Sequence, residues 1–181
     1  IPLRLVGSEM CIRDRYYFKS FELPNRKVIN DIYFLGTDGG RKEKIGSLYE
    51  QFQKMQLKTD MHIVTDSIDP ADPYYALLQK DKVSYEENLE RIAQSKAVLE
   101  VLREGQTGQT LRALECLFYR KKLITNDKRV EQYEYYNKDN IFIIGKDDFD
   151  TLPAFLERPF SDIEEKTVEK YDCKAWLERF W

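Results

Sequence analysis

The run EGQTGQTLRALE, residues 104–115, combines residue types that bind an anion at the start of a helix. Gly108 loosens the turn, and either Thr107 or Thr110 can cap the helix that follows. The free N–H groups at such a helix start, with Arg112 nearby, favour an anion such as a phosphate. The same residues also fit an ordinary capped helix without a ligand.

Glu115 lies one helical turn beyond Arg112 and about two turns beyond the loop at 107–108. A carboxylate at this distance can accept both hydroxyls of a ribose whose diphosphate occupies the helix start. The alternative is a surface ion pair between Arg112 and Glu115, which would contribute only about 0.2–0.5 kcal/mol. The spacing leaves both interpretations open.

Two other turns carry polar residues that could join the same site. The glycine-rich turn 36–40 precedes Arg41, whose planar guanidinium suits phosphate oxygens. This turn is neither a GxGxxG fingerprint nor a P-loop, and it also fits a plain turn followed by a solvated arginine. Asn126 follows a short apolar run and could bond a sugar or a base, although such an asparagine more often caps a helix.

Short apolar runs alternate with amphipathic segments, which predicts parallel strands joined by helices. Strands are expected at 32–35, 61–64, 97–101, 123–125 and 141–144. Helices are expected after the turns at 36–40 and 103–108, after Ser84 with its capping box, at 150–156 and at the C-terminal end. Residues 69–81 contain two prolines and no clear period, and are expected to form a loop with at most one turn of helix.

The predicted fold class is therefore α/β, a doubly wound Rossmann-like parallel sheet in a single domain. Ligands of such sheets bind at the carboxyl ends of the strands, where the strand order reverses. The turns before Arg41 and Thr110 should both open on that side, so we expect one shared cleft.

The composition narrows the function classes. The chain has 181 residues, 42% of them hydrophobic, and Lys and Arg (29) nearly balance Asp and Glu (32). This balance does not favour a nucleic-acid partner, and no apolar run is long enough to span a bilayer. Three scattered cysteines predict neither a disulfide framework nor a zinc site, and one histidine, His62, excludes histidine-rich metal clusters. We expect no metal, no cofactor and a reducing, cytoplasmic location.

The first residues differ in character from the rest. Residues 1–15, IPLRLVGSEMCIRDR, resemble translated sequencing adapter and are expected to be a non-native leader outside the core. Their apolar part is too short and too charged for a signal peptide. Residues 16–30 are expected to be the remnant of an interdomain linker, and residues 31–181 the Rossmann-like domain with its C-terminal helix.

The run SKAVLEVLREGQTGQTLRALECLFYRKKLITND and the later YEYYNKDNIFII carry a resemblance. They are similar to the C-terminal domain of bacterial glycosyltransferase-like proteins with the two-domain GT-B architecture, a group linked to capsule and lipopolysaccharide synthesis. The match covers about residues 95–144. It implies that the chain is the nucleotide-sugar-binding half of such a protein.

The resemblance also implies roles for individual residues. Arg41 and the helix start at 107–110 would hold the donor diphosphate, Glu115 would hold the ribose, and Arg112 would support one of these contacts. The chain departs from many GT-B enzymes because Glu104 stands eleven residues before Glu115 instead of eight. This departure puts a sugar contact by Glu104 in doubt.

The implied reaction needs no metal, because a helix start and an arginine can stabilise the charge on the leaving nucleotide. The glycan acceptor and the catalytic base would belong to a missing N-terminal domain, so we name no base and expect this fragment alone to be inactive. The full-length protein could associate peripherally with the membrane. The alternative is a non-catalytic Rossmann-like binding or scaffold domain. A receiver domain is excluded because the third strand ends in Glu100-Val101-Leu102, without a phosphoacceptor aspartate.

Overall fold

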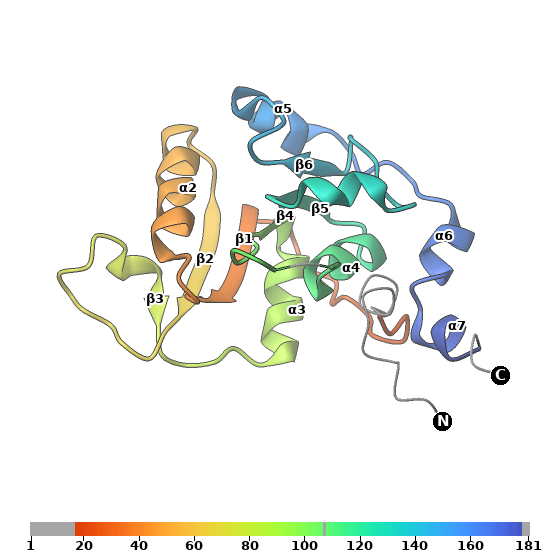
Figure 1. Cartoon of the computed structure of the whole chain (residues 1–181), viewed down its shortest axis with the longest axis horizontal. Coiled ribbons are helices and arrows are strands. Elements are labelled where there is room, and N and C mark those ends of the chain that lie inside the picture. Colours follow the sequence, from red (N-terminus) through yellow and green to blue (C-terminus); the bar gives the residue numbers. More distant parts are fainter. Residues whose placement is uncertain (1–16, 107, 179–181) are drawn as a thin grey trace.

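Six strands form one sheet, and every neighbouring pair of strands in it runs parallel (Figure 1). The computed structural model describes residues 17–106 and 108–178. The strands are β1 (Asn30–Thr37), β2 (Thr59–Val64), β3 (Leu78–Gln79), β4 (Ser95–Glu100), β5 (Lys122–Thr125) and β6 (Ile141–Ile143). Their order in the sheet is β3-β2-β1-β4-β5-β6. This order confirms the predicted doubly wound, Rossmann-like domain.

The order reverses between β1 and β4. The chain runs outward from β1 through β2 to β3, and then returns to place β4 on the other side of β1. Connections from β1 and β4 therefore leave in opposite directions, and a crevice opens between them at the carboxyl ends of the two strands. Any site at this switch point must be built from the loops that follow β1 and β4.

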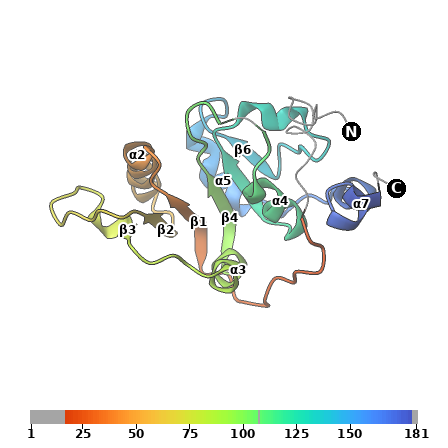
Figure 2. The ribbon, with the colours of Figure 1, turned by 60° about the horizontal axis from the view of Figure 1, so that its bottom comes forward.

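Helices cover both faces of the sheet (Figure 2). The α-helices are α2 (Lys42–Lys54), α3 (Tyr85–Ala93), α4 (Leu111–Phe118), α5 (Leu152–Glu157), α6 (Glu165–Glu169) and α7 (Cys173–Leu177). Short 3-10 helices lie at η1 (Tyr75–Leu77), η2 (Lys128–Gln132) and η3 (Phe149–Thr151). Helices α2 and α5 pack on one face, and α3 and α4 pack on the other.

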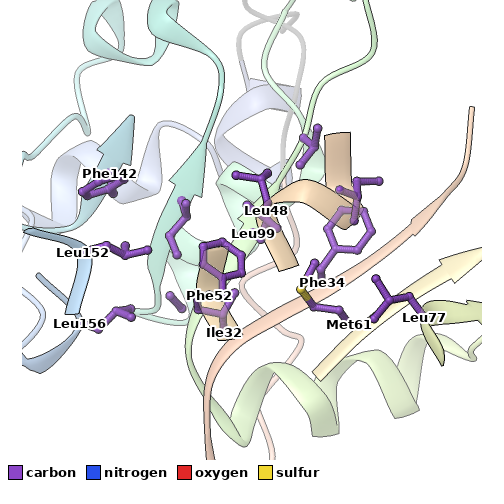
Figure 3. Packing of buried hydrophobic residues seen from close by; sticks show 14 of the residues in the cluster. Ile32, Phe34, Leu48, Phe52, Met61, Leu77, Leu99, Phe142, Leu152 and Leu156 are labelled. Carbon is purple, nitrogen blue, oxygen red and sulfur yellow. The ribbon is translucent and has the colours of Figure 1, made fainter. Parts of the chain in front are cut away.

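Strand alternation divides the buried residues into two cores. On β1, Ile32 and Phe34 point to the α2 side, whereas Tyr33 between them points to the α3 side. Figure 3 shows the first core, where Phe52 of α2 lies among side chains from the sheet and from α5. Its labelled members are Ile32, Phe34, Leu48, Phe52, Met61, Leu77, Leu99, Phe142, Leu152 and Leu156.

The second core includes a residue from the N-terminal segment. Tyr17 is 2% exposed and packs against Phe118 and Tyr119, with ring centroids 5.2 and 5.5 Å away. Its backbone N–H donates to Tyr171 O, and its carbonyl accepts from the N–H of Cys173. The range 16–30, expected to be a linker remnant, thus contributes Tyr17 to the second core, and Leu23 packs against that core. The expected leader, 1–15, lies outside the described residues.

Two elements differ from the sequence prediction. The loop expected at 69–81 contains its one helical turn, η1, and in addition the edge strand β3, which is too short to leave a periodic pattern. The single C-terminal helix expected around Tyr171 is instead the pair α6 and α7. They are separated where residues 171–173 exchange backbone hydrogen bonds with Tyr17.

The capping box at the start of α3 is half confirmed. Ser84 Oγ accepts from the N–H of Glu87 at 3.1 Å, but the Glu87 carboxylate pairs with Arg91 instead of returning to Ser84.

Replacing Ser84 with alanine should lower the free energy of unfolding by about 1 kcal/mol, because one helical N–H loses its acceptor. Urea unfolding of Ser84→Ala and Ser84→Asp would test this, since aspartate keeps an acceptor. Equal losses in both variants would contradict the cap.

Candidate functional site

A pocket of about 650 Å³ opens at the switch point between β1 and β4. Its walls come from the end of β1, the start of α2, the end of β4, the loop 101–106 and the first turn of α4. This volume lies within the range of about 300–1,000 Å³ that is typical of small-molecule sites. Three of the expected site residues line it: Arg41, Thr110 and Arg112.

Arg41 bridges the two loops that form the pocket. Its Nε donates to Asp38 O at 3.2 Å, one Nη to Thr37 O at 2.5 Å, and the other Nη to Val101 O across the switch point. All three acceptors are backbone carbonyls, so these bonds position the guanidinium without neutralising it. The pKa of Arg41 is lowered, first by burial and then by the neighbouring positive charge of Arg103.

Arg103 is a second pocket arginine, to which the sequence analysis assigned no role. Its Nη2 donates to Thr37 Oγ1 at 2.6 Å, and its guanidinium packs on Gly39, where a Cβ would lie only 2.4 Å from Nε. Gly39 also has a φ of +50°, so a larger residue there would be strained and would displace Arg103. Within residues 17–106 and 108–178, neither Arg41 nor Arg103 forms an ion pair.

Thr110 caps α4, as expected for one of the two candidate threonines. Its Oγ1 accepts from the N–H of Ala113 at 3.3 Å and donates to the carboxylate of Glu100. Gly108 is buried with a φ of +88°, which suits glycine, and it shapes the loop without lining the pocket. Thr107 lies outside the described residues, so its expected role is untested.

Arg112, which is half-buried, forms an ion pair with the buried Glu115. One Nη of Arg112 donates to Glu115 Oε2 at 2.7 Å and to Asn88 Oδ1 at 2.8 Å, and the other donates to Leu35 O. Glu115 is only 1% exposed and does not line the pocket. Burial raises the pKa of Glu115, and Arg112 opposes this rise. In this position Glu115 holds Arg112 in place, and the ribose contact suggested by its spacing has no support from the geometry.

Glu100 is a further pocket residue that the sequence analysis did not select. It ends β4, is 6% exposed, and accepts hydrogen bonds from Thr110 and from Thr125 Oγ1. Burial is the main reason that its pKa is raised, and the charge of Asp127 adds to the rise. The sequence feature that could have identified Glu100 is its position as a carboxylate at the end of a predicted central strand, next to the switch point.

Asn126 supports the pocket from behind. Its Oδ1 accepts from the N–H of Leu102 at 2.7 Å, which ties the end of β5 to the loop after β4. The next residue, Asp127, caps η2 by accepting from the N–H of Arg129. Asn126 is therefore neither a helix cap nor a pocket-lining residue in this structure, and no contact to a sugar or base follows from its position.

The single histidine lies in a separate cluster on β2. His62 Nε2 contacts Asp60 Oδ1 at 2.6 Å, and Arg91 of α3 bonds to the same carboxylate.

Across residues 17–106 and 108–178, no group of three or more His, Cys, Asp or Glu side chains could hold a metal ion. Over the same ranges no helix combines the length and the apolar content that crossing a bilayer requires.

The pocket thus combines two arginines without a carboxylate partner among the described residues, a capped helix start and two acidic side chains, Glu100 and Glu104. Such a site can hold an anionic ligand between its cations and can contact hydroxyl groups of that ligand through Glu104. No protein-family model matches the chain, and no curated protein and no solved structure matches it either.

Proposed function

We propose that this chain binds a nucleotide sugar in the switch-point pocket and forms the donor half of a GT-B glycosyltransferase. The acceptor would be a glycan of a bacterial surface polysaccharide, and the reaction would take place in the cytoplasm or at the inner face of the membrane. The observation that carries the proposal is the pair Arg41 and Arg103. Both line the pocket, and within the described residues neither is neutralised by a carboxylate.

A diphosphate fits this pair electrostatically. Burial is the first reason that the pKa of Arg41 is lowered, and the positive charge of Arg103 adds to it while Asp38 opposes it, so the charge of Arg41 is unfavourable next to Arg103 without a ligand. An anion between them would replace this repulsion with two attractions. Arginine suits the role because its planar fork binds phosphate oxygens with two parallel hydrogen bonds.

The rest of the pocket suits the remainder of a nucleotide sugar. Leu35, Leu102 and Leu111 give apolar contact for a base or a sugar ring, and Leu111 is 47% exposed. Glu104 offers an exposed carboxylate for hydroxyl groups. Glu115 is left out of this set, because its carboxylate is buried against Arg112.

The proposed chemistry is charge stabilisation. Breaking the bond between sugar and phosphate leaves negative charge on the nucleotide, and preorganised guanidinium groups stabilise that charge as it develops. The acceptor and the base would come from a second domain, so this chain should bind donors without transferring the sugar. An open half-site leaves much of the ligand solvated, which predicts a Kd on the order of 0.1–1 mM.

Titration calorimetry with UDP-glucose, GDP-mannose, dTDP-glucose and CMP tests the proposal. Arg103→Ala should weaken the best ligand about 10- to 100-fold, because a charge-assisted hydrogen bond contributes about 1.5–3 kcal/mol. Arg158→Ala is the matched control, since Arg158 is exposed and pairs with Asp139 away from the pocket. Binding of none of these ligands, or equal binding by both variants, would favour the scaffold alternative.

A further inference from the structure

Asn88 of α3 connects three elements behind the wall of the pocket. The side chain is 4% exposed. Its Oδ1 accepts from the hydroxyl of Tyr33 on β1 at 3.0 Å and from Arg112 of α4 at 2.8 Å. Its Nδ2 donates to Glu115 Oε1 at 3.4 Å. One buried amide group therefore joins β1, α3 and α4.

The neighbours of Asn88 require an amide at this position. The guanidinium of Arg112 can only donate, whereas the carboxylate of Glu115 accepts, so the amide oxygen faces Arg112 and the amide nitrogen faces Glu115. An aspartate would offer Glu115 no donor, and a leucine would offer neither a donor nor an acceptor. Asparagine bonds to both members of the ion pair at once.

Helix α3 is tied to other elements on both sides of Asn88. The hydroxyl of Tyr85, one turn before Asn88, contacts the hydroxyl of Tyr17. Arg91, about one turn after Asn88, donates to Asp60 of β2 at 3.0 Å. Because both flanking turns are anchored, Asn88 can fix the position of a partner side chain.

That partner, Arg112, lines the pocket. Its Nη1 donates to Asn88 and to Glu115, and its Nη2 donates to Leu35 O at 3.2 Å. Its Cζ lies 6.0 Å from the centroid of the Tyr33 ring. Within residues 17–106 and 108–178, these bonds use three of the five N–H groups of the guanidinium. The other two remain for a ligand.

We infer that Asn88 is a positioning residue of the donor pocket: it holds the guanidinium of Arg112 in the pocket wall, where the remaining N–H groups bind phosphate oxygens of the ligand. Arg112 then adds a third cation to Arg41 and Arg103. The inference rests on the proposed function, because it concerns the same pocket. Without Asn88, the long side chain of Arg112 would have to be ordered when the ligand binds, and this ordering lowers the affinity.

Titration calorimetry with UDP-glucose, GDP-mannose and dTDP-glucose compares wild type, Asn88→Ala, Arg112→Ala and the double variant. Asn88→Ala should weaken the best ligand about 2- to 10-fold, the effect of ordering one long side chain. Combined with Arg112→Ala, it should cause no further loss, a result that a general loss of stability would not give. Glu86→Gln, at an exposed position of the same helix, is the control and should bind like wild type.

NMR of the ligand-free protein gives an independent measurement. The Nε–H signal of Arg112, assigned by its absence in Arg112→Lys, should shift in Asn88→Ala and stay in place in Glu86→Gln. Tyr33→Phe keeps the ring in the core and removes only one hydrogen bond to Asn88, so it should shift the signal in the same direction by less. Tyr33→Phe provides the test if Asn88→Ala does not fold.

The possible failures are distinguishable. Three results overturn the role of Asn88 and leave the proposed function in place: no loss of affinity in Asn88→Ala or an equal loss in both backgrounds, an unchanged Arg112 signal, and an Arg112→Ala variant that binds as tightly as wild type. Binding of none of these sugar nucleotides by wild type overturns both.

Discussion

Replacing Arg112 with alanine is expected to lower the free energy of unfolding by about 2–4 kcal/mol. Removing one partner of a buried pair costs about 3–5 kcal/mol, and the 22% exposure of the Arg112 side chain reduces this figure. The variant leaves Glu115 without its cation and removes the hydrogen bonds to Asn88 and to Leu35 O. Urea unfolding near neutral pH measures the loss.

The loss should depend on pH in a defined direction. Arg112 opposes the effect of burial on Glu115, so without Arg112 the pKa of Glu115 rises further. The folded variant then keeps a proton that the unfolded chain releases above 4.5, the ordinary pKa of glutamate. The destabilisation is smallest below this pH and grows as the pH rises.

A double variant provides the control. Arg112→Ala with Glu115→Gln removes the uncompensated charge and keeps a hydrogen-bonding group for Asn88. It should be more stable than Arg112→Ala above about pH 6 and should lose most of the pH dependence. A midpoint of unfolding that is the same in wild type and in Arg112→Ala would show that the pair has no structural role.

Replacing Phe52 with alanine is expected to lower the free energy of unfolding by about 3–5 kcal/mol. Phe52 is 0% exposed and lies within the first core (Figure 3). Its ring stacks on that of Phe149, with ring centroids 5.9 Å apart. Truncation removes its buried area and leaves a cavity between α2, the sheet and η3. Single domains are stable by only about 5–15 kcal/mol, so the loss is a large fraction of the total.

Chemical denaturation of Phe52→Ala, Phe52→Leu and Lys44→Ala checks this prediction. Leucine refills part of the cavity and should recover part of the loss. Lys44 is exposed on the same helix, so its replacement should change stability by less than about 0.5 kcal/mol. A loss in Phe52→Ala no larger than that in Lys44→Ala would mean that α2 does not cover the sheet as described.

The sheet was largely predictable because its strands are short apolar runs between clear turns. The sequence indicated β1, β2, β4, β5 and β6. The two residues of β3 leave no periodic signal, and only their pairing with β2 makes them a strand. The break between α6 and α7 depends on backbone bonds to Tyr17, a long-range contact that local periodicity cannot contain.

The site was predictable in its place but not in its contacts. Strand order and turn chemistry located it at the loops after β1 and β4, where Arg41, Thr110 and Arg112 line one pocket. The position of Glu115 was misleading because residues 113–117 of α4 are all buried, so no face of that stretch is free for a ligand. The place of Arg103 in the pocket could not be predicted, because it depends on a hydrogen bond to Thr37, a residue that is distant in the sequence.

The contact of Tyr17 with residues 171–173 also bears on the order in which the chain folds. The two segments lie far apart in the sequence, and the related bond between the Lys19 N–H and Asp172 Oδ1 spans 153 residues. Closing so long a loop has a large entropic cost that only a preformed core can offset, whereas the pairing of β1 with β2 closes a short one. The sheet should therefore assemble first, and the two ends should join it in the last stage of folding.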